Sequence, residues 1–205
     1  MDSRELLQAQ VAQPGSVEEL SAIVNGTVWT TDFRQLERGD EKAQLAVAAT
    51  PRTVLLQVDL SSRVHQFAAP NASRVCFGLP SRPQAPFMFG RRLCDCDTIM
   101  QFDNRAGMET VSQSGFSAFA LSVEHEHFGA IAESLGIDGA VPQRPVRGSV
   151  KLMQPETMSR LRLSMQGLLQ AALERDESAT GNIARTLDSD LLLEVVMAFA
   201  GGEEP

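Results

Sequence analysis

The sequence predicts an α+β fold in which N-terminal helices precede an antiparallel β-barrel, with a two-helix hairpin at the C-terminus. Three observations predict it: residues 1–26 follow helical periodicity, residues from Thr27 to about Leu121 alternate with a period of two, and helical periodicity returns from Pro155. A period of two marks half-buried strands, whereas a period near 3.6 marks helices. Many short strands separated by turns are typical of an antiparallel barrel or sandwich.

Two short helices are expected at the N-terminus. Residues 4–8 are good helix formers. Ser16 and Glu19 have the spacing of a capping box, in which each side chain bonds the backbone near the other. Pro14 separates the two helices, and Gly26 ends the second.

The middle of the chain is expected to be a series of short strands. These segments are rich in β-branched and aromatic residues, and Gly, Pro, Asn and Asp stand between them as turn residues. The expected strands are residues 28–33, 43–48, 53–60, 74–79, 87–89, 98–102, 110–112 and 116–122.

A helix over residues 124–135 and a Pro- and Gly-rich loop over 138–150 are expected next. Pro155 is suited to the first turn of a long helix, and a second helix over 183–199 would end at the glycines that follow it. The expected domains are therefore residues 1–150, the N-terminal helices and barrel, and residues 151–205, the hairpin and the start of an interdomain linker.

The hairpin has two interpretations: it packs on the barrel through one face, or part of its surface forms a dimer interface. Leu163 lies outside the main apolar stripe, so the first helix is apolar around more of its circumference than one-sided burial requires. This favours a dimer interface, formed by Leu161, Met165, Leu168, Leu169 and Ala172.

Composition predicts a soluble cytoplasmic protein. No apolar run approaches the roughly 18 residues of a membrane span, and the N-terminus lacks the features of a signal peptide. The three cysteines do not indicate a disulfide framework. DNA-binding surfaces neutralise phosphates with Lys and Arg, but this chain has a net charge of −8, and its only lysines are Lys42 and Lys151.

No catalytic or metal site is expected. His125, Glu126 and His127 stand close together, but on a helix residues two apart point in different directions. Cys94 and Cys96 lack a second Cys/His pair at zinc spacing; redox sensing is an alternative for them. Because no nucleophile or nucleotide-binding motif is present, we expect neither an enzyme nor a cofactor.

Three phrases between Trp29 and Ile137 resemble the N-terminal sensor half of AraC/XylS-type transcription regulators. They are DFRQLERGD (residues 32–40), SSRVHQFAAPNASRVCFGLP (61–80) and GFSAFALSVEHEHFGAIAESLGI (115–137). The resemblance implies a cupin-like barrel that binds a small effector and a homodimer formed through the helical hairpin. DNA would be contacted only by a C-terminal domain that this chain does not include.

Arg34 and Arg38 form an RxxxR element that resembles the signature of PilZ-type cyclic di-GMP receptors. Two guanidinium groups at this spacing suit phosphate or guanine recognition. Asn71, Ser73 and the adjacent Arg74 resemble the start of the second PilZ element, although its glycine comes two positions late. The predicted ligand is therefore cyclic di-GMP; the competing hypothesis is a small carboxylate or apolar effector inside the barrel.

The sequence thus predicts the effector-binding and dimerisation domain of an AraC-type regulator. Two alternatives stay open. A cupin-like metalloenzyme would contain stoichiometric metal, and a free-standing adaptor for a nucleotide second messenger would have no DNA-binding domain.

Overall fold

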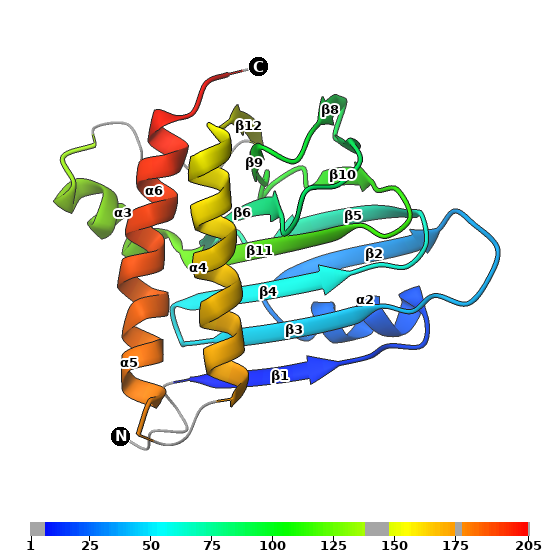
Figure 1. Cartoon of the computed structure of the whole chain (residues 1–205), viewed down its shortest axis with the longest axis horizontal. Helices are drawn as coiled ribbons and strands as arrows, with labels where there is room; N and C mark the ends of the chain where they lie inside the picture. Colours follow the sequence, from blue (N-terminus) through cyan, green and yellow to red (C-terminus); the bar gives the residue numbers. More distant parts are fainter. Residues whose placement is uncertain (1–6, 138–147, 175–177, 205) are drawn as a thin grey trace.

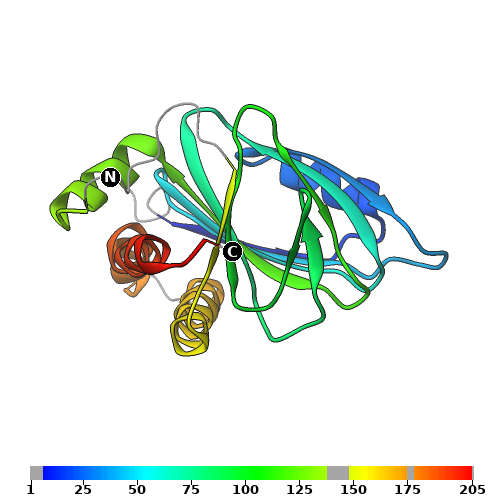
Figure 2. The same ribbon diagram turned by 90° about the horizontal axis from the view of Figure 1, so that it is seen from above.

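Two antiparallel β-sheets face each other in the computed structural model, and helices cover the outer side of the larger sheet (Figures 1 and 2). The structure describes residues 7–137, 148–174 and 178–204. The larger sheet has seven strands, in the order β1 (Gln8–Ala12), β3 (Gln44–Ala49), β4 (Thr53–Asp59), β11 (Ser117–Glu124), β6 (Arg74–Pro80), β9 (Thr98–Gln101) and β12 (Ser149–Leu152). The smaller sheet has five, in the order β2 (Trp29–Gln35), β5 (Val64–Pro70), β10 (Met108–Val111), β7 (Phe87–Phe89) and β8 (Arg92–Cys94).

The α+β class is confirmed, with the two sheets forming a sandwich rather than a closed barrel. The eight expected strands are present as β2, β3, β4, β6, β7, β9, β10 and β11. Of the loop expected over 138–150, residues 138–147 lie outside the described residues, and Ser149 already belongs to β12. This strand also crosses the expected domain boundary.

The N-terminal helix expected over residues 4–8 needs correction. Residues 4–6 lie outside the described part of the chain, but Gln8 begins β1, which pairs antiparallel with β3 from Gln8↔Ala49 to Ala12↔Leu45. Leu7 is fully buried at its start. Backbone pairing and burial therefore outweigh the weak helical preference of these residues.

The helices are α2 (Val17–Asn25), α3 (His125–Ser134), α4 (Pro155–Glu174), α5 (Thr180–Arg185) and α6 (Leu191–Gly201), with a π-helical segment η1 (Thr186–Asp190) between the last two. The predicted cap of α2 is confirmed, because the Ser16 hydroxyl accepts a hydrogen bond from the Glu19 amide. The predicted antiparallel hairpin is also present: α4 packs against α6, with α5 and η1 continuing into α6 (Figure 1). No helix in the described part of the chain has the length and apolar character to cross a membrane.

The larger sheet is buried on both faces, so its central strands read as continuous apolar runs. Every residue of β6 is buried. Side chains that alternate with the pleat enter two different cores: Val75, Phe77 and Leu79 face the helices, and Cys76 faces the smaller sheet. In β11, Phe119, Leu121 and Val123 likewise join the helical core.

The five residues proposed as a dimer interface belong to this helical core. Leu161, Met165, Leu168, Leu169 and Ala172 are each at most 8 % exposed and pack with the sheet and α6. The chain therefore buries this stripe itself, which corrects the prediction that these side chains meet a second protomer. Leu163, in contrast, is 75 % exposed on the opposite face of α4.

Candidate ligand-binding cavity

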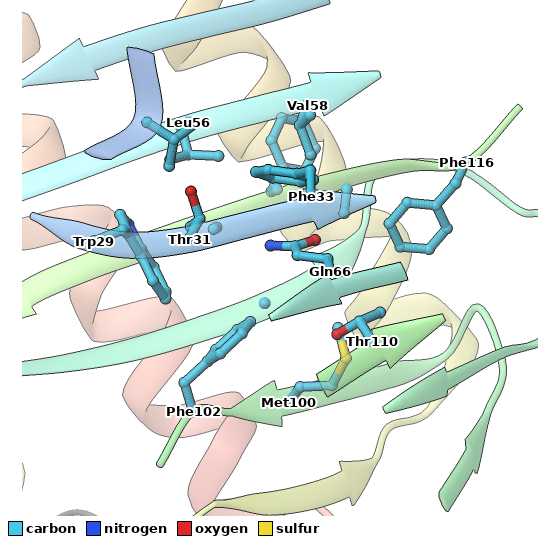
Figure 3. A pocket seen from close by; sticks show the side chains of 15 residues that line it. Trp29, Thr31, Phe33, Leu56, Val58, Gln66, Met100, Phe102, Thr110 and Phe116 are labelled. Atoms are coloured by element: carbon cyan, nitrogen blue, oxygen red, sulfur yellow. The ribbon is translucent and has the colours of Figure 1, made fainter. Parts of the chain in front are cut away.

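A cavity lies between the two sheets (Figure 3). Its walls come from the inward faces of β2, β4, β5, β6, β9, β10 and β11 and from one residue of α2. The lining includes the side chains of Val24, Trp29, Thr31, Phe33, Leu56, Val58, Gln66, Met100, Phe102, Thr110 and Phe116.

The cavity exists because the central strands present small residues to it. Gly78 of β6 and Ala118 and Ala120 of β11 line its wall. The neighbours with which they alternate along each strand are large and belong to the helical core: Phe77 and Leu79 in β6, and Phe119 and Leu121 in β11. A Cβ atom at Gly78 would lie 2.9 Å from Cε2 of Phe102 and 3.2 Å from Cε of Met100. Small side chains on one face of a strand thus leave space between sheets that would otherwise be filled.

The cavity is narrow and mostly apolar. Its empty volume, including the part open to solvent, is about 580 Å³, but the centres of water molecules can occupy only about 50 Å³ of it. Trp29 and Phe89 each pack edge-to-face on Phe102, with ring centroids 4.9 and 5.1 Å apart, respectively. No charged side chain is among the described residues that line it, so the cavity suits a compact, mainly hydrophobic molecule.

Few polar groups reach the cavity. Thr31 bonds Asn25 of α2 through its hydroxyl at 3.2 Å. Gln66 and Thr110 are the other polar side chains of the lining (Figure 3). The indole Nε1 of Trp29 is buried without an acceptor among the described residues.

Helix α2 closes the cavity along β2. Val24 lines the cavity, and side chains of α2 bond the free edge of the strand. The Asn25 amide donates to the carbonyl of Thr31 at 3.1 Å and accepts from its backbone N–H, and the amide of Phe33 donates to the Ser21 hydroxyl. The helix thereby takes the place of a neighbouring strand at this edge.

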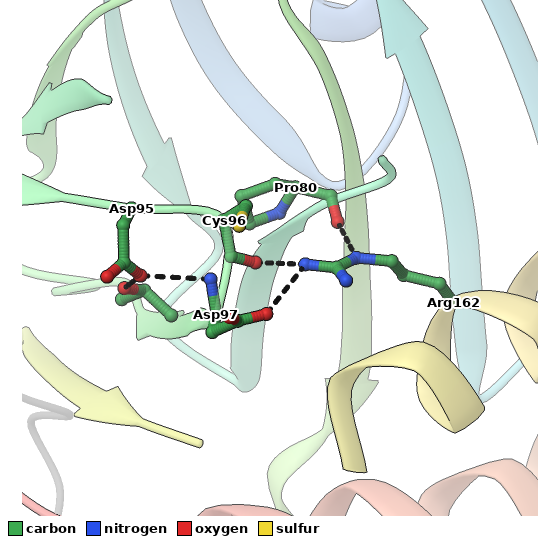
Figure 4. A network of polar contacts seen from close by, with 6 residues as sticks. Pro80, Asp95, Cys96, Asp97 and Arg162 are labelled. Atoms are coloured by element: carbon green, nitrogen blue, oxygen red, sulfur yellow. Dashed lines mark hydrogen bonds and ion pairs between the residues drawn. The ribbon is translucent and has the colours of Figure 1, made fainter. Parts of the chain in front are cut away.

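Arg162 of α4 connects the helical layer to the strands that end near the cavity (Figure 4). Its Nε donates to the carbonyl of Pro80, at the end of β6, at 3.0 Å. Its Nη2 donates to the carbonyl of Cys96 and lies 3.4 Å from the carboxylate of Asp97, in the turn before β9. Because the Arg162 side chain is 10 % exposed, these contacts form a largely buried link between α4 and two strands of the cavity wall.

The arginines of the RxxxR element lie outside the cavity. Arg34 is on the outward face of β2, where its side chain is 70 % exposed and pairs with Asp32 at 2.9 Å. Arg38 is exposed in the loop after β2. The structure therefore places this pair on the surface of the five-stranded sheet.

Of the other three predicted ligand residues, Asn71 and Ser73 lie in the turn after β5, and Arg74 begins β6 of the larger sheet. Arg34 is opposite His65 in the β2–β5 register, so Asn71 lies six residues further along, or about 20 Å. Asn71 and Ser73 bond each other in the turn after β5. The structure thus does not bring the five predicted residues together.

Arg74 is buried and bonded within the chain. Its Nε donates to the Ser122 hydroxyl at 2.8 Å, and its Nη2 donates to the carbonyl of Arg52 at 2.7 Å. Burial lowers the pKa of Arg74 from its ordinary value, while nearby Cys76 and Glu124 oppose that shift. These contacts give Arg74 a structural role at the start of β6.

The histidine and cysteine candidates are dispersed. His125 and His127 lie in α3, as expected, and the His127 ring bonds the carbonyl of Asp188 at 2.7 Å. Burial raises the pKa of the Cys76 thiol to about 12 and that of Cys94 to about 11. In the described part of the chain, no group of three or more His, Cys, Asp or Glu side chains could hold a metal ion.

The residues that line the cavity were not among the site residues predicted from the sequence. A signal for them exists in β6 and β11, where small residues (Cys76, Gly78, Ala118, Ala120) alternate with large ones. Such alternation in a strand buried on both faces indicates space on one side. Gln66 could not be assigned to the cavity in this way, because residues 64–70, which form β5, were not expected to be a strand.

No family model matches the sequence, and no curated protein sequence matches it significantly. Among solved structures, the AraC-like transcriptional activator CuxR is similar, with a TM-score of 0.62 and 13 % identity over 97 % of this chain and 72 % of that chain. KdgF from Halomonas sp. covers 45 % of this chain and 86 % of its own, at 14 % identity and a TM-score of 0.32. A cupin-2 domain protein from Rhodospirillum rubrum, Rru_A2000, covers 70 % and 88 %, at 9 % identity and a TM-score of 0.30. The match to the AraC-like activator shows a shared fold over nearly the whole chain. The TM-scores of the other two structures are too low to establish a shared fold.

Proposed function

We propose that this chain is the effector-binding part of an AraC-type transcription regulator, and that a small effector binds in the cavity between the sheets. The single observation that carries the proposal is the cavity, whose lining from both sheets is mostly apolar with a few polar side chains. The fold shared with an AraC-like activator supports the regulatory role. An acidic chain with two lysines is poorly suited to contacting DNA itself.

For the effector to regulate, its binding in the cavity must change the conformation of the protein at its surface. Met100 and Phe102 are cavity residues in and just after β9, and the turn before β9 carries the two Arg162 contacts at Cys96 and Asp97. A ligand that displaces β9 would therefore alter the position of α4. That a second protomer takes part in this response remains a prediction.

We also propose a binding role rather than a catalytic one. The cavity lining contains no charged residue, histidine or cysteine among the described residues, so the threonine hydroxyls in it have no neighbouring base to activate them for nucleophilic or acid–base chemistry. The metalloenzyme alternative is tested by metal analysis of the purified protein, in which a stoichiometric metal would support it.

The cavity is tested with Ala120→Phe, which should fill it. Trp29 is the only tryptophan of the chain and lines the cavity, so its fluorescence reports occupation. We expect cyclohexanol to shift Trp29 emission in the wild type and the affinity to fall at least about tenfold in the variant, since its phenyl ring takes the ligand's space. The control is Ala171→Phe, which adds the same side chain at an exposed position of α4. Equal binding by all three proteins would contradict the site.

The regulatory role is tested in the host cell. Transcripts of cells that produce the wild-type protein should differ from those of cells that produce Ala120→Phe, because the variant cannot respond to an effector. Identical transcript profiles, with both proteins folded and present at equal levels, would contradict a role in transcription.

Cyclic di-GMP is the second candidate effector, favoured by the exposure of Arg34 and Arg38 near one turn. Two bases and two phosphates exceed the space and polarity of the cavity, so this ligand would bind on the outer surface. Calorimetry should then show that Arg34→Ala and Arg38→Ala each lose most of the affinity. Arg63→Ala, an exposed arginine near the same loop, is the control, and binding that is unchanged in both test variants excludes this candidate.

A further inference from the structure

We propose that Gln66 and Thr110 select the effector of the cavity, and that this effector is a compact, uncharged, mostly apolar molecule with one hydroxyl, carbonyl or amide group. The inference rests on the proposed function, because it presumes that the cavity is the effector site. It adds the chemical class of the ligand and the residues that recognise it.

Gln66 and Thr110 are direct neighbours on adjacent strands. They are register partners in the β5–β10 pair, and side chains at such positions start about 5 Å apart. Both point into the sandwich, since Thr110 is 6 % exposed and both line the cavity (Figure 3). An amide and a hydroxyl thus stand side by side on one wall.

Neither side chain is hydrogen-bonded to the part of the chain that the structure describes. The amide of Gln66 and the hydroxyl of Thr110 make no hydrogen bond with any residue of the described ranges, whereas Thr31, the third polar side chain of the lining, is bonded to Asn25. Neither group is among the side-chain atoms of the described residues that are closed off from solvent without a partner. Both therefore remain open to a hydrogen-bonding partner that enters the cavity.

The absence of charge in the described lining limits what that partner can be. A carboxylate or ammonium group would leave its hydration shell without an oppositely charged side chain to replace it, and that transfer is highly unfavourable. Gln66 offers two donors and an acceptor, and Thr110 offers one donor and an acceptor. A neutral hydroxyl, carbonyl or amide matches this pair, and the aromatic and aliphatic remainder of the cavity matches an apolar body.

The size of the cavity favours a compact ligand. Only about 50 Å³ is open to the centres of water molecules, so even a six-membered ring requires side chains to move. Met100 is the residue best suited to do so, because its unbranched side chain has several accessible conformations. We therefore choose probes with one six-membered ring.

The experiment compares cyclohexane, cyclohexanol and cyclohexanecarboxylate, which share one ring and differ in the polar group. None absorbs where tryptophan does, so emission from Trp29 reports binding directly. In the wild type we expect cyclohexanol to bind and cyclohexanecarboxylate to bind at least about tenfold more weakly, because the cavity lacks a cation to pair with it.

The double variant Gln66→Leu/Thr110→Val keeps the shape of the wall but removes its polar groups. We expect it to bind cyclohexanol about tenfold more weakly, the amount that one or two hydrogen bonds supply, and to bind cyclohexane with unchanged or higher affinity. Thr30→Val, on the outward face of β2, is the control and should leave all three affinities unchanged. Thermal melting of each protein confirms that it is folded.

The outcomes separate the two proposals. A selective loss of cyclohexanol binding supports the inference. Equal changes for cyclohexane and cyclohexanol, or stronger binding of the carboxylate, overturn the inference and leave the cavity as the effector site. No response of Trp29 to any of the probes overturns both.

Discussion

Arg162 joins α4 to two strands through its guanidinium group. It is nine-tenths buried, and it donates to two carbonyls at the ends of different strands. Pro80 terminates β6 and Cys96 precedes β9, so a single guanidinium group holds both strand ends against α4. Arginine suits this position because its donors lie in one rigid plane.

Arg162→Ala is expected to lower the free energy of unfolding by about 3 kcal/mol, because it leaves buried carbonyl groups without donors. Urea unfolding measures the loss. Arg160→Ala, on the exposed face of the same helix, should change it by less than about 0.5 kcal/mol. Similar losses in the two variants would show that the contacts of Arg162 are not responsible.

The candidate site was only partly predictable at this scale. Residue types in the sequence indicated Arg34 and Arg38, which are both exposed, but not Gln66 and Thr110. The latter pair consists of common residues 44 positions apart, and only the register of β5 and β10 makes them neighbours. Chemistry carried by unremarkable side chains depends on tertiary structure and leaves no local motif.

Individual elements were predictable where one periodicity dominated. Alternating or continuous apolar runs predicted the strands β2, β4, β6 and β11. In contrast, β5 contains His65, Gln66 and a terminal Pro70, residues that resemble a loop because Pro and polar side chains are uncommon in strand interiors. The strands β8 and β12 are short and contain charged residues (Arg92 and Lys151), so unlike the equally short but apolar β7 they do not resemble strands in the sequence.

Helix α2 depends on Asn25 for its position beside β2. Asn25→Ala removes both hydrogen bonds to the Thr31 backbone, so we expect the free energy of unfolding to fall by about 1–3 kcal/mol. Hydrogen exchange should show faster exchange of the Thr31 amide than in the wild type. Glu18→Gln, exposed on the same helix, should leave that rate unchanged; unchanged exchange in Asn25→Ala as well would mean that other contacts hold the helix.

At the scale of the whole molecule, the hairpin and the larger sheet share one apolar core. Leu161 and Met165 of α4 join Phe77 and Leu121 of the sheet in it. Periodicity predicted the two helices, but it could not say which of their faces the sheet would cover. The face left exposed on α4 is the one that carries Leu163.

A homodimer that uses the hairpin would use side chains that stay exposed on it, and Leu163 is the most exposed large apolar one in the described residues. If the chain forms a homodimer through this face of α4, Leu163→Glu should convert it to a monomer, because a symmetric contact would lose two buried leucines at about 1.5–3 kcal/mol each. Sedimentation velocity measures the change at fixed protein concentration. Gln166→Glu, also exposed on α4, adds the same charge without removing apolar surface. Equal masses for wild type and Leu163→Glu would contradict a contact at this residue.

The bonds from α2 to β2 also bear on how copies of the chain behave toward one another. As an end strand of the five-stranded sheet, β2 would otherwise present unpaired N–H and C=O groups, the template on which a second chain adds a strand and from which fibrous aggregates grow. Ser21 and Asn25 occupy those groups at Phe33 and Thr31. The helix that closes the cavity thus also occupies this edge of the sheet, where a second chain could otherwise add a strand.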